Sequence, residues 1–187
     1  ILLRSPGVFK GYLHDEAATA ATFDGEGWQR TGDIGRLDEA GELMIVDRKK
    51  SIIITSGGKN IAPSEIENAL RDSPYVREAI VVGDGRKYLG GLIQIDFDTV
   101  GRWASENDIS YSGYKSLAVH PEVRKLVAGV VAEINKRFAR VENVRRFVIL
   151  EKELDHEDGE LTATQKIRRA AIERKFAREL AIIYDAE

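Results

Sequence analysis

The sequence contains no cysteine in its 187 residues, and its three histidines, His14, His120 and His156, are far apart. The absence of cysteine excludes disulfide bonds, thiolate metal sites and a cysteine nucleophile. The histidines do not have the spacing of zinc ligands, so we expect no metal site in this chain. The sequence also has no apolar run of membrane-spanning length and no recognisable signal peptide, so we expect a cytoplasmic protein, with peripheral association with a membrane left open.

The composition is typical of a globular protein with a well-solvated surface. Hydrophobic residues make up 43% of the chain, enough for the core of one medium domain or two small ones, and charged residues make up 32%. The formal net charge is −3. Because nucleic-acid binding requires local positive charge, this balance argues against nucleic acid as the main partner.

The first part of the chain, residues 1–46, is predicted to be a small and mostly β segment. Ile1-Leu2-Leu3 has the pattern of a strand without an initiator methionine, so we expect the chain to be part of a longer polypeptide. Asp15 suits the N-cap of a short helix over residues 16–23. A hairpin turn then leads to a return strand over residues 42–46.

The second part, residues 51–187, is predicted to be a small mixed sheet with helices on its faces, which places the chain in the α+β class. β-branched and apolar runs predict strands over residues 51–55, 76–82, 92–95 and 147–150. Apolar residues at helical spacing predict a helix that begins at Pro63 and two more over residues 98–107 and 121–140. They also predict a basic amphipathic helix over residues 167–184. Ser64 and Glu67 have the spacing of a capping box. The composition changes at residues 47–50, where we place the boundary between the two parts.

Three segments contain residues suited to an anionic or nucleotide ligand. The carboxylate in Thr31-Gly32-Asp33 could accept hydrogen bonds from a sugar diol, or it could cap its own turn. Arg48 and Lys59 flank a short strand and a Gly57-Gly58 turn, which would leave both cations at one end of a sheet, or they are ordinary surface charge. Lys166 lies just before the last helix and could stabilise a developing negative charge, or it is simply a basic helix start.

Taken together, these segments resemble the C-terminal part of an adenylate-forming acyl-CoA synthetase, most of all the long-chain fatty-acyl-CoA ligases. The resemblance is carried by Gly7-Val8-Phe9-Lys10-Gly11-Tyr12 with Thr31-Gly32-Asp33, by Asp47-Arg48-Lys49-Lys50 through Glu67, and by Leu161-Thr162-x-Thr164-x-Lys166. Their order and separations make it specific. It implies that residues 1–46 end a large AMP-binding domain, that residues 47–50 are a hinge, and that residues 51–187 are a mobile C-terminal domain.

The resemblance also implies roles at the nucleotide. Asp33 and Arg48 would bind the ribose hydroxyls of ATP and of the acyl-adenylate. Lys59 stands where many members have an arginine near the phosphate, which puts a bidentate phosphate clamp in doubt. Lys166 would be the adenylation lysine. The substrates implied are a fatty acid, ATP and CoA, with Mg²⁺ on the triphosphate and no metal ligands in this chain.

The remaining roles concern domain rotation between the two half-reactions. Lys50 would be the hinge residue, and Ser56, Gly57 and Gly58 would face the CoA thiol in the second step. The main phosphate loop and acyl pocket of this family lie in its large domain, so the 187 residues alone are expected to be inactive.

Two alternatives stay open at the level of sequence. One is another member of the superfamily: a fatty-acyl-AMP ligase, an aryl-CoA ligase or a peptide-synthetase adenylation domain. The long segment over residues 103–140 favours the long-chain group. The other is a non-catalytic module that binds a lipid surface or an acidic partner through the basic last helix, where Glu173 and Glu179 dilute the positive charge.

Overall fold

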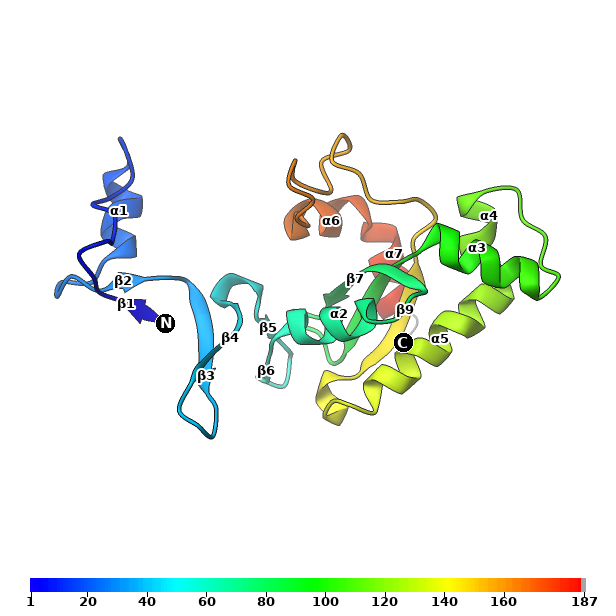
Figure 1. The fold of residues 1–187 in the computed structure, drawn as a ribbon, viewed down its shortest axis with the longest axis horizontal. Helices are drawn as coiled ribbons and strands as arrows, with labels where there is room; N and C mark the ends of the chain where they lie inside the picture. The colour runs from blue at the N-terminus through cyan, green and yellow to red at the C-terminus, as the bar shows by residue number, and fades with distance from the viewer. Residues whose placement is uncertain (186–187) are drawn as a thin grey trace. The chain divides into compact units, whose positions relative to one another are not determined.

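The computed structural model describes residues 1–185 (Figure 1). The chain divides into two compact units, Ile1–Ile52 and the part that begins at Ile53. Every buried hydrophobic side chain of the described chain belongs to the second unit. The second unit therefore has hydrophobic cores of its own, whereas the first is held mainly by backbone pairing and local hydrogen bonds.

The first unit consists of two short β ribbons and one helix. Strands β1 (Leu2–Leu3) and β2 (Gln29–Arg30) are antiparallel, and so are β3 (Asp33–Leu37) and β4 (Leu43–Arg48). Helix α1 (Glu16–Thr22) begins where the Asp15 carboxylate accepts a hydrogen bond of 2.8 Å from the Ala18 N–H. The predicted N-cap and the predicted hairpin are both confirmed.

A two-stranded ribbon opens the second unit, formed by β5 (Ile53–Ile54) and β6 (Asn60–Ile61). The predicted strand over residues 51–55 was too long, because Lys49–Ser51 form a 3₁₀ turn, η1. The Lys49 N–H donates to the Gly32 carbonyl at 2.7 Å, so this turn is held by the first unit.

The main sheet has the order β7-β8-β9 and is mixed, as predicted. Strand β7 (Val76–Val82) is antiparallel to β8 (Leu89–Ile95), and β8 is parallel to β9 (Val144–Ile149). All residues of β8 are buried, which fits its place at the centre of the sheet with helices on both faces.

The helices cover the two faces of this sheet and form two hydrophobic clusters (Figure 1). One face packs against α2 (Pro63–Arg71), α3 (Phe97–Glu106), α4 (Tyr114–Ala118) and α5 (Pro121–Asn135). The other face packs against α6 (Arg169–Lys175) and α7 (Ala177–Tyr184). A short 3₁₀ turn, η2 (Arg140–Glu142), leads into β9. This architecture confirms the α+β class.

Three helix predictions were wrong in detail, each for a tertiary reason. Helix α5 ends at Asn135 instead of continuing to residue 140, because the Asn135 side chain exchanges hydrogen bonds of 2.9 and 3.0 Å with the Val144 backbone. The last helix is broken at Phe176, whose φ of −100° and ψ of 30° are not helical. The capping box is not formed, since the Glu67 carboxylate accepts instead from the Val81 N–H at 2.7 Å.

Candidate functional site

In the first unit, the structure brings two of the predicted site residues together. The register of β3 and β4 pairs Asp33 with Arg48, and Arg48 Nε lies 3.0 Å from Asp33 Oδ1. The Asp33 N–H donates to Thr31 Oγ1 at 3.0 Å, which fixes the start of β3. The Arg48 side chain is 70% exposed and that of Asp33 is 24% exposed. The carboxylate is therefore oriented by Arg48 and still reachable from solvent.

Arg48 also lines an open pocket of about 510 Å³ that lies within the first unit. The lining residues are Ala21, Thr22, Arg30, Thr31, Gly32, Arg48, Lys50 and Ser51. Three of these side chains are cationic and none is acidic, so the pocket suits an anionic ligand. Gly32 has a φ of +77°, a left-handed conformation that a residue with a side chain would adopt only with strain.

In the second unit, Ser56, Gly57 and Gly58 form the tight turn between β5 and β6. The Gly58 N–H donates to the Thr55 carbonyl at 2.8 Å, and Gly58 has a φ of +73°. The Ser56 N–H donates to the Arg86 carbonyl at 2.9 Å, which ties the turn to the loop after β7. Lys59 is exposed at the end of this turn. Arg48 and Lys59 thus belong to different units, Arg48 to the first and Lys59 to the second.

Lys166 lies on a tight hairpin in the segment that connects the sheet to α6. The Thr162 N–H donates to the Lys166 carbonyl at 2.8 Å, and the Lys166 N–H donates to Thr162 Oγ1 at 3.0 Å. Leu161 and Ile167 form the next bridge. Gln165 has a φ of +60°, which completes the turn beside the lysine. The hairpin presents Lys166 to solvent at its tip.

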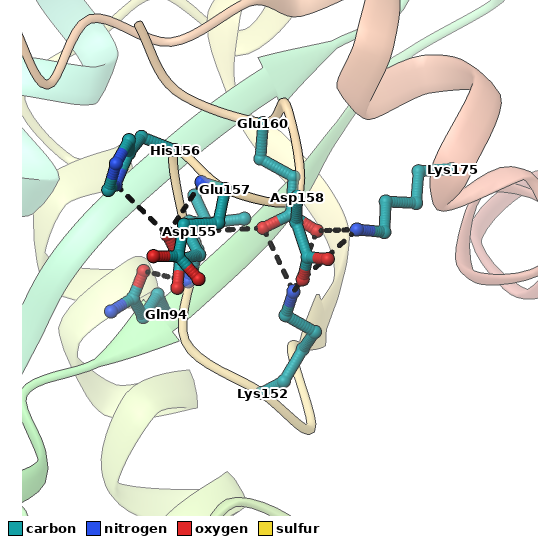
Figure 2. Close-up of polar contacts among 9 residues, drawn as sticks. Gln94, Lys152, Asp155, His156, Glu157, Asp158, Glu160 and Lys175 are labelled. Carbon is teal, nitrogen blue, oxygen red and sulfur yellow. Dashed lines mark hydrogen bonds and ion pairs between the residues drawn. The ribbon is translucent and has the colours of Figure 1, made fainter. Parts of the chain in front are cut away.

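The base of this hairpin holds a buried carboxylate between two lysines (Figure 2). Glu160 is 0% exposed, and its Oε1 lies 2.9 Å from Lys152 Nζ and 2.8 Å from Lys175 Nζ. Asp158 pairs with the same two lysines. We call Lys152, Asp158, Glu160 and Lys175 the Glu160 cluster.

The two lysines of this cluster favour the ionised forms of both carboxyl groups. Burial raises the pKa of the Glu160 carboxyl, but hydrogen bonds from Lys175 and Lys152 outweigh it, and the pKa lies below its ordinary value. Hydrogen bonds from the same lysines lower the pKa of Asp158. Glu160 Oε2 also accepts from the Asp155 N–H at 2.8 Å, so both carboxylate oxygens are bound.

A second ion pair anchors the chain just after the hairpin. Arg169 pairs with Glu67 of α2 and donates to the Val81 carbonyl at 3.0 Å. Glu67 is buried, and burial raises its pKa. The first turn of α6 is thereby attached to β7 and α2 through one guanidinium.

The Glu160 cluster and the role of Glu67 were not predicted from the sequence. Glu67 carried a usable signal, since it shares the buried face of α2 with Pro63, Ile66 and Leu70 at helical spacing. Glu160 carried none, because it stands in a run of charged residues that looks fully solvated.

The described residues contain neither a cluster of metal ligands nor a membrane-spanning helix. Residues 1–185 bring together no group of three His, Asp or Glu side chains that could hold a metal ion. Within the same residues, every helix is either too short or too polar to cross a lipid bilayer.

Comparison with known proteins identifies relatives along the whole chain. Residues 50–187 match the family described as AMP-binding enzyme C-terminal domain. The chain is 38% identical to long-chain-fatty-acid–CoA ligase FadD15 of Mycobacterium tuberculosis, over 100% of this chain and 31% of that protein. It is 33% identical to human long-chain-fatty-acid–CoA ligase 6, over 98% of this chain and 27% of that protein. The chain thus spans about a third of the length of these relatives.

Solved structures of adenylation domains share the fold. The adenylation domain of a carboxylate reductase from Mycobacterium chelonae has a TM-score of 0.81 at 24% identity, over 98% of this chain and 27% of that one. The corresponding domain from Segniliparus rugosus, solved in complex with AMP and a carboxylic acid, has a TM-score of 0.79 at 22% identity, over 98% of this chain and 27% of that one. With residues 50–187 matched to the family model and the fold shared, this chain belongs to the AMP-binding enzyme C-terminal domain family.

Proposed function

We propose that this chain supplies part of the nucleotide site and the mobile lysine domain of an ATP-dependent, AMP-forming long-chain fatty-acid–CoA ligase. Similarity to ligases of that name along the whole chain supports the proposal. The observation that carries it is the Asp33–Arg48 pair at a cationic pocket. The motif that contains Lys166 lies in a hairpin suited to presenting an ammonium group to a ligand.

The reaction has two chemical steps with different needs. A fatty-acid carboxylate is a poor acylating agent, so its oxygen first attacks the α-phosphorus of ATP, forming an acyl-adenylate and releasing pyrophosphate. The thiol of CoA then attacks the acyl carbon and displaces AMP, forming the thioester. Because the two transition states develop charge at different atoms, one fixed set of groups cannot serve both equally well.

In this proposal, Asp33 accepts hydrogen bonds from the two ribose hydroxyls, and Arg48 orients the carboxylate while contacting the ribose itself. The place of Arg48 in the lining of the pocket supports this role. Lys59, exposed beside the Ser56–Gly58 turn, would contact phosphate as a single point charge.

Lys166 serves the first step. Its ammonium would approach the carboxylate and the α-phosphate oxygens, where negative charge concentrates as the new P–O bond forms. Lys50 is the proposed pivot, and rotation about it would exchange the Lys166 hairpin for the Ser56–Gly58 turn before CoA attacks. The compactness of each unit by itself supports a rigid-body movement.

Mg²⁺ would accompany the triphosphate and neutralise part of its charge. The residues that the structure describes contain no carboxylate and histidine group fit to hold a metal ion, so no step is assigned to Mg²⁺ ligands in this chain.

The proposal is tested on the full-length protein with ATP, radiolabelled pyrophosphate, CoA and fatty acids of graded length. Fatty-acid-dependent ATP–pyrophosphate exchange and acyl-CoA formation are expected. Exchange with aryl acids but not fatty acids would favour an aryl-CoA ligase, and adenylate formation without CoA thioester would favour a fatty-acyl-AMP ligase. The isolated 187 residues are expected to catalyse neither reaction, and exchange by them would contradict the proposal.

Contact with anionic membrane remains a secondary proposal for the basic last segment. Arg169 and Lys175 are already engaged in the ion pairs described above, which reduces the positive charge available there. Pelleting of the full-length protein with anionic and with neutral vesicles measures its remaining affinity for an anionic membrane.

A further inference from the structure

The hairpin that carries Lys166 is a ladder whose base is Glu160. From base to tip, its pairs are Glu160–Arg168, Leu161–Ile167 and Thr162–Lys166. The first pair is closed by the Arg168 N–H, which donates to the Glu160 carbonyl at 2.9 Å. Each pair in a ladder sets the register of the next. The backbone of Lys166 is therefore placed by what holds Glu160 on one strand of the hairpin, together with the Arg169–Glu67 pair that follows the other strand.

Little else holds the tip. Residues 163–166 are exposed, and Ile167 is the hairpin residue that packs against the second hydrophobic cluster. Exposed turns with few apolar contacts open easily, so the geometry of the tip depends on its anchored end. The anchoring strength of the base thus decides how well the lysine is placed.

Glu160 is anchored by three groups from two segments. Lys152 and the Asp155 N–H come from the loop that follows β9, and Lys175 ends α6. Figure 2 shows Lys152 and Lys175 approaching the Glu160 carboxylate from different sides. Removing the negative charge would leave two ammonium groups facing each other beside Asp158, and like charges at this range repel.

We propose that Glu160, held between Lys152 and Lys175, is a positioning residue for Lys166 in the adenylation step. The Glu160 cluster fixes the base of the ladder, and the ladder delivers the Lys166 ammonium to the reacting oxygens. This inference rests on the role proposed for Lys166. Glu160 itself touches no substrate, because its side chain is fully buried.

The test uses Glu160→Gln in the full-length enzyme, with the two half-reactions measured separately. The rate of adenylation, measured as pyrophosphate release, is expected to fall by about 10- to 100-fold, which is the effect of misplacing a catalytic group by about 1 Å. Thioester formation from supplied acyl-adenylate is expected to keep its rate. Equal losses in both half-reactions would indicate a general structural defect and overturn the proposal.

The matched control is Glu151→Gln. It makes the same chemical change nearby, in the exposed Glu151–Lys115 pair of 2.7 Å, and is expected to leave both half-reactions unchanged. A slowing of adenylation by this control equal to that of Glu160→Gln would overturn the proposal, because loss of any acidic charge in this region would then suffice.

A double-mutant cycle with Lys166→Ala separates the two proposals. If Glu160 acts only through Lys166, Glu160→Gln has no further effect on the residual adenylation rate of Lys166→Ala. If the two effects multiply, the positioning role is wrong. If Lys166→Ala itself leaves adenylation unchanged, the role proposed for Lys166 is wrong, and the inference about Glu160 fails with it.

Hydrogen exchange gives a readout that does not depend on catalysis. The Thr162 and Lys166 amides are expected to exchange faster in Glu160→Gln, while the amides of β8 keep their protection. Lys175→Met, which removes one lysine and leaves the Glu160–Lys152 pair, should show the same local effect in a milder form and replaces Glu160→Gln if that variant does not fold. Unchanged exchange at both amides in the folded variant would overturn the proposal.

Discussion

Asp33 and Arg48 face each other across the β3–β4 hairpin, with Arg48 Nε 3.0 Å from Asp33 Oδ1. The Arg48 side chain is 70% exposed, so solvent screens the pair and its contribution to stability is less than about 1 kcal/mol. Because the pair contributes so little to the free energy of unfolding and its arginine lines a cationic pocket, it is better suited to orienting a ligand group than to stabilising the fold.

Arg48→Lys in the full-length enzyme is therefore expected to raise KM for ATP by about tenfold without a change in thermal stability. Lysine keeps the charge but loses the planar fork that meets the Asp33 carboxylate and the ribose together. The control is Arg36→Lys, the same change at an exposed position of β3. Pyrophosphate release measured against ATP concentration checks the prediction, and equal KM values in the two variants would contradict it.

Lys166→Ala in the full-length enzyme is expected to reduce adenylation by about 100-fold or more and to leave thioester formation from acyl-adenylate intact. The physical reason is that the ammonium stabilises charge that develops only in the first transition state. Single-turnover assays of each half-reaction check this. A comparable loss in both half-reactions would show that the lysine does not act in adenylation alone.

The stability of the Glu160 cluster should depend on pH in the acid range. The pKa of Glu160 in the folded chain lies below its ordinary value of 4.5, so its contribution is fully present above 4.5 and is lost as pH falls through the lower folded value. Asp158 acts in the same direction. Glu67 opposes them, because its raised pKa makes its contribution largest below 4.5 and smaller as pH rises.

Urea unfolding of the chain between about pH 3 and 6 measures this linkage. Glu160→Gln is expected to flatten the rise of the free energy of unfolding with pH, and at neutral pH to lower it by about 1–3 kcal/mol, because both lysines are partly exposed. Glu151→Gln should keep the slope of the unsubstituted chain. An unchanged slope in Glu160→Gln would show that folding does not lower the pKa of the Glu160 carboxyl, and would contradict the ion pairs assigned to it.

Local pattern was enough to predict most of the second unit's elements. The β-branched run over residues 76–82 predicts β7 with its observed bounds, and helical spacing predicts α5 from its first residue, Pro121. The strands predicted over residues 92–95 and 147–150 begin three residues later than β8 and β9 do. The helix errors lie where a distant group intervenes: Val144 ends α5, and Phe176 breaks the last helix so that α6 and α7 both reach the sheet. No periodicity within a helix encodes such contacts.

The site shows the same division. Motif spacing marks Asp33, Arg48 and Lys166, and the hairpin register brings the first two together. The burial of Glu160 was not predictable, because it depends on Lys152 and Lys175, which come from different elements. In sequence, its surroundings alternate in charge as a solvated surface would. Only the path of the chain between β9 and α6 turns that run into an internal ion cluster.

Two glycines, Gly90 and Gly129, lie in contrasting surroundings: the first is closely packed and the second is in open space. A Cβ on Gly90 of β8 would lie 2.5 Å from Ile183 Cγ2. Tyr88, which immediately precedes β8, donates its hydroxyl to the Ile183 carbonyl at 2.6 Å. A Cβ on Gly129 of α5 would meet nothing within 4 Å. Strand β8 thus accepts α7 only because Gly90 has no side chain.

Gly90→Ala is therefore expected to lower the free energy of unfolding by about 1–3 kcal/mol, as overpacking of a core does. Gly129→Ala, the same change in an open helical position, is expected to raise it by about 0.5–1 kcal/mol through helix propensity. Urea unfolding of the two variants checks both signs together. In addition, the α7 amides should lose hydrogen-exchange protection in Gly90→Ala before the α5 amides do, and equal protection of the two helices would contradict the assigned contact.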